Sequence, residues 1–81
     1  MKIRVLFFAS LAEVAGTPEI TLDVPAHATV GSLLGELAAR FPALNPERGR
    51  ILAAVNSRYV PGDAPLNDGD EVAFFPPVSG G

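Results

Sequence analysis

The chain has 81 residues, which suffices for one small domain and leaves no room for a second core. Hydrophobic residues make up 48% and charged residues 19%, a composition that favours a globular domain over a disordered segment. The net charge is -3 and the six basic residues are scattered along the chain, so the sequence argues against nucleic-acid binding.

The first third of the chain predicts two strands with a short helix between them. Residues 2–8 are rich in β-branched and aromatic side chains and contain no turn former, which predicts a strand. The segment Ser10–Ala15 predicts one short helix, capped by Ser10 and ended by Gly16. Residues 19–24 alternate between apolar and polar side chains and predict a second strand.

The strongest helix signal begins after Thr29, a good N-cap residue. Apolar side chains then recur at helical spacing and form a single stripe, which predicts a helix with one buried face. Pro42 ends this helix. The stripe consists of Val30, Leu33, Leu34, Leu37, Ala38 and Phe41.

The second half of the chain predicts three more strands, at residues 51–56, 58–60 and 71–75, the last one launched from an Asp68-Gly69 turn. One long helix cannot cover both faces of such a sheet. We therefore expect an α+β fold, a mixed sheet with the helix packed across one side. The domain should span residues 1–76, followed by a flexible tail of residues 77–81.

Two aromatic side chains are predicted on the sheet face that the helix leaves uncovered. In the last strand Phe74 and Phe75 point to opposite faces, so Phe75 points outward if Phe74 joins the core. Alternation likewise turns Phe8 and Leu6 outward, although sheet twist would also allow Leu6 to be covered. Large aromatic residues on an open face indicate a protein-binding patch, and Tyr59 is a weaker candidate for it.

No self-contained catalytic site is visible in the sequence. Asn67-Asp68-Gly69-Asp70 partly matches a calcium loop but lacks the alternating ligands and the distal glutamate. We therefore expect a solvated turn there and no metal. His27 is the only histidine, which we expect at the surface, and no serine has a G-x-S-x-G context. The acidic stretch comprises Asp63, Asn67, Asp68, Asp70 and Glu71.

The sequence closes with Gly80 and Gly81, preceded by two prolines. Glycine has no Cβ to obstruct a narrow channel, which suits a terminal carboxylate that is threaded into another protein's active site. The prolines favour extended geometry, and residues 77–81 would reach about 16 Å if extended. The alternative is a frayed end that finishes in glycine by chance.

Three segments carry a family resemblance: VLFFA at residues 5–9, LAAVN at residues 52–56, and DGDEVAFFPPVSGG at residues 68–81. They resemble the MoaD family, the small subunits of molybdopterin synthase, and the similarity runs through the whole chain. FFPPVSGG is the most specific element, because the wider ubiquitin-like sulfur carriers share only the terminal Gly-Gly. The resemblance implies a β-grasp (ubiquitin-like) fold, which agrees with the expected order of elements.

The resemblance also implies a chemistry. Members of this family are sulfur carriers: a MoeB-like enzyme adenylates the terminal carboxylate using ATP and Mg, and sulfur replaces AMP. The thiocarboxylate is consumed in making the dithiolene of molybdopterin inside a MoaE-like large subunit. In this chain Gly81 would carry the sulfur, with Gly80 beside it, and no cysteine offers another carrier. The partner-binding residues would be Phe75, Phe8, Tyr59, Pro76, Pro77, Val78 and Ser79.

By this resemblance the chain is a sulfur-donor subunit that binds no cofactor itself, in a heterotetramer of two small and two large subunits. Two alternatives are a ThiS-like carrier for thiazole synthesis and a ubiquitin-like protein modifier, although Lys2 is the only lysine for chains on itself. No segment approaches the ~18 apolar residues of a membrane span, and no signal-peptide layout is present. We therefore expect a cytoplasmic protein.

Overall fold

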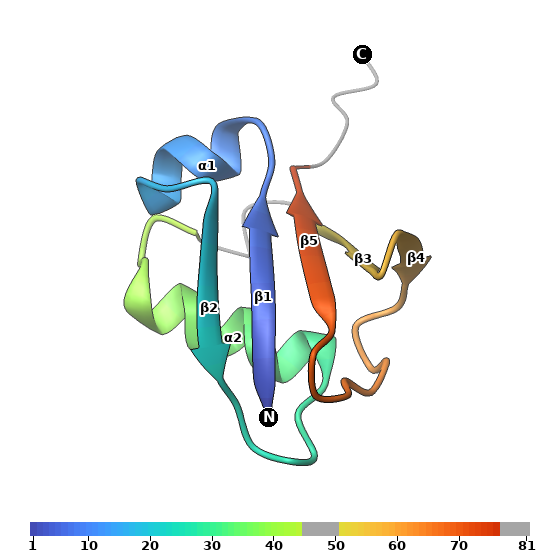
Figure 1. Cartoon of the computed structure of the whole chain (residues 1–81). Helices are drawn as coiled ribbons and strands as arrows, with labels where there is room; N and C mark the ends of the chain where they lie inside the picture. The colour runs from blue at the N-terminus through green and yellow to red at the C-terminus, as the bar shows by residue number, and fades with distance from the viewer. Residues whose placement is uncertain (45–50, 77–81) are drawn as a thin grey trace.

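The computed structural model describes residues 1–44 and 51–76. Within these residues, five strands form one mixed sheet and the longer of two helices lies across one face of it (Figure 1). This arrangement confirms the expected α+β class. The elements are β1 (Lys2–Phe7), α1 (Ser10–Ala15), β2 (Glu19–Asp23), α2 (Val30–Arg40), β3 (Leu52–Val55), β4 (Arg58–Val60) and β5 (Glu71–Phe75).

The strands lie in the order β2-β1-β5-β3-β4, so the first and last strands are neighbours at the centre of the sheet. β1 and β5 are parallel, with Arg4 opposite Glu71 and Phe7 opposite Phe74, and the other neighbouring strands are antiparallel. β5 therefore ends at the same edge of the sheet as β1. Figure 1 shows the end of β5 beside the end of β1.

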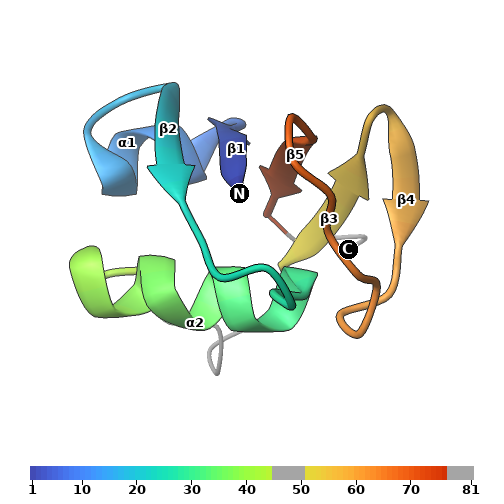
Figure 2. The ribbon, with the colours of Figure 1, turned by 60° about the horizontal axis from the view of Figure 1, so that its bottom comes forward.

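Figure 2 shows α2 lying across one face of the sheet, and the side chains between the two form most of the core. α2 contributes Val30, Leu33 and Leu37, as its apolar stripe predicts. The remaining members of the stripe are partly buried around them. The strand residues of this core are Ile3, Val5, Phe7, Leu22, Ala53, Val72 and Phe74.

α2 begins at a complete capping box. The Thr29 hydroxyl accepts a hydrogen bond from the Ser32 amide (3.2 Å), and the Ser32 hydroxyl accepts one from the Thr29 amide (2.9 Å). The backbone amides of the first two helix residues donate to the loop before β5: Val30 N–H bonds Ala64 O, and Gly31 N–H bonds the carbonyl of residue 62. The helix N-terminus is thus satisfied by the protein itself.

Two local predictions need correction. Ser10 does not cap α1: the N-cap is Ala9, with φ 51° and ψ -130°, and no side chain bonds the first turn. The reason is that Leu11 N–H bonds Phe8 O directly, so the chain turns from β1 into the helix with Ser10 already helical. The strand expected at residues 51–56 ends at Val55, because Asn56 adopts φ 50° and starts a turn. Gly16, in contrast, ends α1 as predicted.

Candidate functional site

The sheet face that α2 does not cover carries a row of apolar side chains. The register aligns Leu6 on β1, Ala73 on β5, Ala54 on β3 and Tyr59 on β4. Next to this row, where β5 ends, lies Phe75. Because the two alanines are short, the larger side chains on either side stand above the sheet and remain accessible.

Three aromatic rings make up the accessible part of this surface, and we call Phe8, Tyr59 and Phe75 the aromatic cluster. Phe75 is at its centre: its ring stacks on Phe8 with centroids 4.6 Å apart and an interplanar angle of 13°. On the other side it tilts against Tyr59, at 5.7 Å and 46°. Phe8 is 42% exposed and Tyr59 is 71% exposed. The placement of Phe8 and Phe75 on the open face is confirmed, and Tyr59 is the most exposed of the three.

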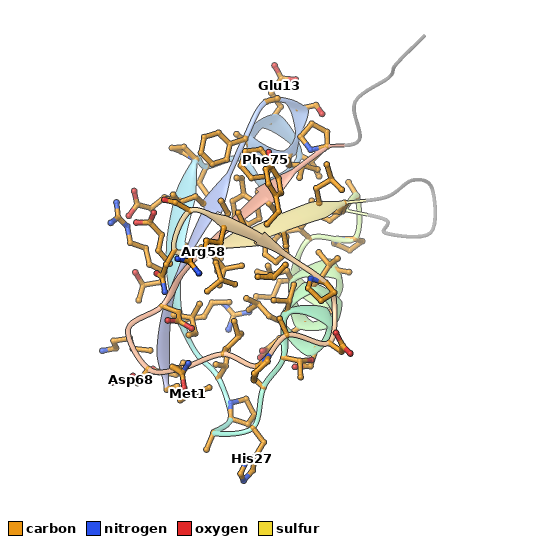
Figure 3. All side chains as sticks on the ribbon, turned by 90° about the vertical axis from the view of Figure 1, so that its right-hand side faces the viewer. Met1, Glu13, His27, Arg58, Asp68 and Phe75 are labelled. Atoms are coloured by element: carbon orange, nitrogen blue, oxygen red, sulfur yellow. The ribbon has the colours of Figure 1, made fainter. Side chains whose placement is uncertain are left out.

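A hollow of about 250 Å³ lies beside the rings, and Figure 3, seen from the β4 side of the sheet, labels Phe75. The hollow is predominantly apolar, so a partner's apolar side chain would displace weakly held water there. Its lining residues are Leu6, Phe8, Ala54, Ser57, Tyr59, Glu71, Ala73 and Phe75.

Leu52 extends the apolar surface and was missed at the sequence level. It pairs with Phe75 in the β3–β5 register and is 38% exposed. Alternation along β3 predicts that Leu52 and Ala53 point to opposite faces of the sheet. Only the pairing of β3 with β5 shows that Leu52 lies beside Phe75. The apolar surface is therefore wider than the three rings.

The other half of the same face is charged. Arg4 Nε donates to Glu19 (2.6 Å) and Arg4 Nη1 donates to Glu71 (3.0 Å), which joins three strands across the sheet. The hydrogen bond from Arg4 holds the pKa of the Glu19 carboxyl below its usual range, and the same bond raises the pKa of Arg4. All three side chains are substantially exposed, so the pairs add little stability. They mark the polar border of the apolar surface.

The C-terminal segment starts directly from the aromatic cluster. Pro76 is half-buried and follows Phe75, at the end of β5. The five positions expected to form the reactive and partner-binding tail lie outside the described residues: Pro77, Val78, Ser79, Gly80 and Gly81.

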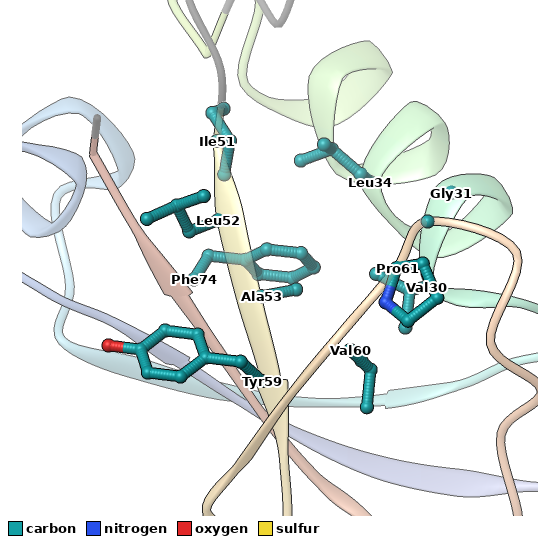
Figure 4. A pocket seen from close by; sticks show the side chains of 11 residues that line it. Val30, Gly31, Leu34, Ile51, Leu52, Ala53, Tyr59, Val60, Pro61 and Phe74 are labelled. Atoms are coloured by element: carbon teal, nitrogen blue, oxygen red, sulfur yellow. The ribbon is translucent and has the colours of Figure 1, made fainter. Parts of the chain in front are cut away.

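A second, larger hollow of about 690 Å³ lies at the edge of the sheet between α2, β3 and β4 (Figure 4). Phe74 and Ala53 form its base, and Val30, Leu34 and Val60 line its sides. Among the described residues, the Tyr59 phenol is the only ionisable group that lines this hollow, and in Figure 4 its oxygen points away from it. Its described lining is mainly apolar surface.

The structure also bears on the residues considered for metal binding. Across residues 1–44 and 51–76, no group of three or more His, Cys, Asp or Glu side chains is placed to hold a metal ion. His27 is exposed at the surface, as expected. The prediction of a solvated turn is wrong for Asp70, which is only 8% exposed. The Asn56 side chain and the Asn67 backbone amide both donate hydrogen bonds to its carboxylate. No helix in the described part of the chain is long and apolar enough to cross a membrane.

Known proteins are similar in sequence to this chain over nearly its whole length. The ThiS family matches residues 5–81. The chain is 52% identical to the molybdopterin synthase sulfur carrier subunit of Escherichia coli, over 98% of this chain and 99% of that protein. It is 45% identical to the protein of the same name from Chlamydomonas reinhardtii, over all of both chains.

Solved structures show the same fold. SAMP1 from Haloferax volcanii superimposes over 100% of both chains with a TM-score of 0.85 and 36% identity. A chain from the complex of subunits 1 and 2 of molybdopterin-converting factor of Helicobacter pylori superimposes over all of both chains with a TM-score of 0.66, and at 24% identity this likeness shows the fold alone. From its fold and its full-length relatives, the chain belongs to the ThiS family of β-grasp proteins, as a sulfur carrier subunit of the molybdopterin synthase type.

Proposed function

We propose that this chain carries sulfur as a thiocarboxylate on Gly81 and delivers it to the large subunit of molybdopterin synthase, which binds the aromatic cluster. The observation that carries the proposal is the position of the cluster at the end of β5, next to Pro76. The match to the ThiS family runs through residue 81, so the Gly-Gly end belongs to the shared sequence. Docking and delivery would then use neighbouring parts of one surface.

The chemistry follows from the weakness of a carboxylate as an electrophile. At neutral pH the terminal carboxylate is ionised and resists attack. Its oxygen first bonds to the α-phosphorus of ATP and pyrophosphate leaves. Hydrosulfide then attacks the carbonyl carbon of the acyl adenylate, AMP leaves and a proton is lost, which yields the thiocarboxylate. In this proposal ATP and Mg are bound by a MoeB-like activating enzyme, and the chain supplies only its terminus.

The aromatic cluster explains how each partner would find the terminus. Five residues beyond Pro76 reach at most about 16 Å, so a partner that grips Phe75 holds its reaction centre within that distance. Large aromatic side chains in a partner's pockets supply most of the binding energy in such interfaces. If the activating enzyme and the large subunit both use this face, their binding is mutually exclusive. The thiocarboxylated chain must then leave the activating enzyme before it binds the large subunit.

The chemical step is tested by intact mass. Incubation with the activating enzyme, Mg-ATP and a sulfur donor should raise the mass by about 16 Da, for one oxygen replaced by sulfur. Deletion of Gly81, or extension beyond it, should abolish this gain. Gly80→Ala should slow it, since a Cβ crowds the channel next to the reacting carbonyl. His27→Ala, at the far end of the molecule from Phe75 (Figure 3), is the matched control and should react normally.

Delivery is tested with the thiocarboxylated chain and cyclic pyranopterin monophosphate, with and without the large subunit. We expect dithiolene product only when the large subunit is present, and product without it would make this chain an enzyme by itself. Native mass of the mixture checks the heterotetramer of two small and two large subunits. The pairing of a small and a large subunit has precedent in the complex of the Helicobacter pylori fold neighbour.

A second candidate function is protein modification. It is favoured by the similarity to SAMP1, named a small archaeal modifier protein, at 36% identity over the whole of both chains. An acyl adenylate that meets a lysine amine instead of sulfur gives an isopeptide bond and releases AMP. A cellular search for peptides branched by Gly80-Gly81 separates the two functions, since sulfur delivery alone leaves no such conjugates.

A further inference from the structure

Asp70 is the only buried charged or polar side chain within residues 1–44 and 51–76, at 8% exposed. Both carboxylate oxygens are engaged: Oδ1 accepts from Asn56 Nδ2 at 2.9 Å and Oδ2 accepts from the Asn67 amide at 2.7 Å. Its backbone oxygen accepts from the amide of Arg4 on β1 (3.0 Å). A carboxylate buried in this way is kept only where its hydrogen bonds are complete.

Asn56 completes the connection from the other side. Its side-chain Oδ1 accepts from the Glu71 amide (3.0 Å), and its own amide donates to Glu71 O (2.8 Å). Asn56 and Ser57 have φ of 50° and 73°, the positive values that the two-residue turn of a tight hairpin requires. The turn between β3 and β4 is therefore bound, through one amide side chain, to the start of β5.

Tyr59 depends on this turn for its position. β4 has only three residues, lies at the edge of the sheet and pairs with β3 alone. Only Arg58 separates Tyr59 from the turn, and Tyr59 is 71% exposed with Phe75 as its aromatic neighbour. A short edge strand is held by few hydrogen bonds and shifts easily. The hydrogen bonds at the turn are therefore important for the position of β4.

We propose that Asp70 and Asn56 are positioning residues that hold the β3–β4 hairpin so that Tyr59 stands against Phe75 in the docking surface. The inference rests on the proposed function for its consequence, which is partner binding. Its structural part concerns the isolated chain alone. Neither residue touches the partner in this scheme; both act through the ring of Tyr59.

The hydrogen-bond pattern supplies an exact rescue. Asp70→Asn brings a second amide donor into the site, so whichever way the new side chain is turned, one of the two original bonds is lost and two donors face each other. Adding Asn56→Asp exchanges the two groups. The amide at position 70 then donates to the carboxylate at position 56 and accepts from Asn67, while the second carboxylate oxygen accepts from Glu71. All three bonds are restored with charge and volume unchanged.

Tyr59 also provides the readout, because it is the only tyrosine and the chain has no tryptophan. Intrinsic fluorescence therefore reports on one ring of the aromatic cluster. In Asp70→Asn we expect a lower emission anisotropy of Tyr59 and easier quenching by acrylamide, and partner binding about five- to tenfold weaker. The double exchange Asn56→Asp with Asp70→Asn should return both signals toward the wild type.

Two further variants decide between positioning and a general loss of stability. Phe74→Leu destabilises the core directly and should leave the Tyr59 anisotropy of the folded protein unchanged. In a Tyr59→Ala background, Asp70→Asn should weaken partner binding no further. Wild-type anisotropy in Asp70→Asn, no recovery in the double exchange, or a binding loss that persists without Tyr59 would each overturn the inference. If Tyr59→Ala itself binds normally, the docking role of Tyr59 in the proposed function is wrong, and the anisotropy still decides whether Asp70 and Asn56 hold the β3–β4 hairpin.

Discussion

Phe75→Ala is the sharpest test of the docking surface, because its neighbour in sequence provides the control. In the free protein the substitution removes the stacked contact with Phe8 at 4.6 Å and the tilted contact with Tyr59 at 5.7 Å. Each aromatic pair stabilises by about 0.5–1.5 kcal/mol, so the free energy of unfolding should fall by about 2 kcal/mol. For a domain of this size that lowers Tm by roughly 8–16 °C.

The loss in partner binding should be separate from this loss of stability. Truncation of a central aromatic anchor costs at least about 2 kcal/mol of binding, which corresponds to a Kd about thirtyfold higher. Phe74→Leu is the matched control: Phe74 is 1% exposed on the opposite face, and the shortened side chain should cost about 1–2 kcal/mol of stability. Its Kd for the large subunit should stay within about twofold of the wild type, because no atom of the docking surface changes.

Calorimetric titration of the large subunit with each variant, well below both Tm values, measures the binding loss, and urea unfolding followed by circular dichroism measures stability. Wild-type affinity in Phe75→Ala would show that the partner does not bind this face. Equal losses of affinity in Phe75→Ala and Phe74→Leu would show that binding follows stability and that the aromatic surface has no special part in it.

Three further predictions concern the fold. Gly35→Ala, with open space around its Cβ, should raise the free energy of unfolding by about 0.5–1 kcal/mol, whereas Gly31→Ala places a Cβ 3.0 Å from a loop carbonyl oxygen and should be at least ~1 kcal/mol less stable than Gly35→Ala in urea titrations. Ser57→Gly should stabilise by about 0.5–1 kcal/mol, since glycine adopts φ 73° without strain; an unchanged or lower urea midpoint contradicts this. Because Arg4 lowers the pKa of the Glu19 carboxyl, their pair stabilises the fold above about pH 4.3, the pKa of the unfolded chain, and this contribution disappears as the pH falls through the lowered folded-state pKa. Glu19→Gln should therefore lose less stability than the wild type between neutral and acid pH, and identical pH profiles would refute the effect.

The sequence alone determined which side of each element is buried. The stripe of α2 and the alternation in β1 and β5 follow from helical and strand periodicity, which any chain with this pattern must satisfy to bury its apolar side chains. The same logic placed Phe8 and Phe75 on the open face. The Thr29 cap and the Gly16 stop are equally local, since each depends on the backbone preferences of a few adjacent residues.

Only the tertiary structure decided which residues are neighbours. The parallel pairing of β1 with β5 joins residues 67 positions apart and brings Phe8 against Phe75, and the pairing of β5 with β3 adds Leu52 to the surface. The sequence around Asp70 is typical of an exposed turn. Its burial depends on Asn56, 14 residues away, which contacts Asp70 only once β3 is paired with β5. Alternation specifies the face of a strand, but long-range backbone pairing chooses its neighbours, and no local pattern records that choice.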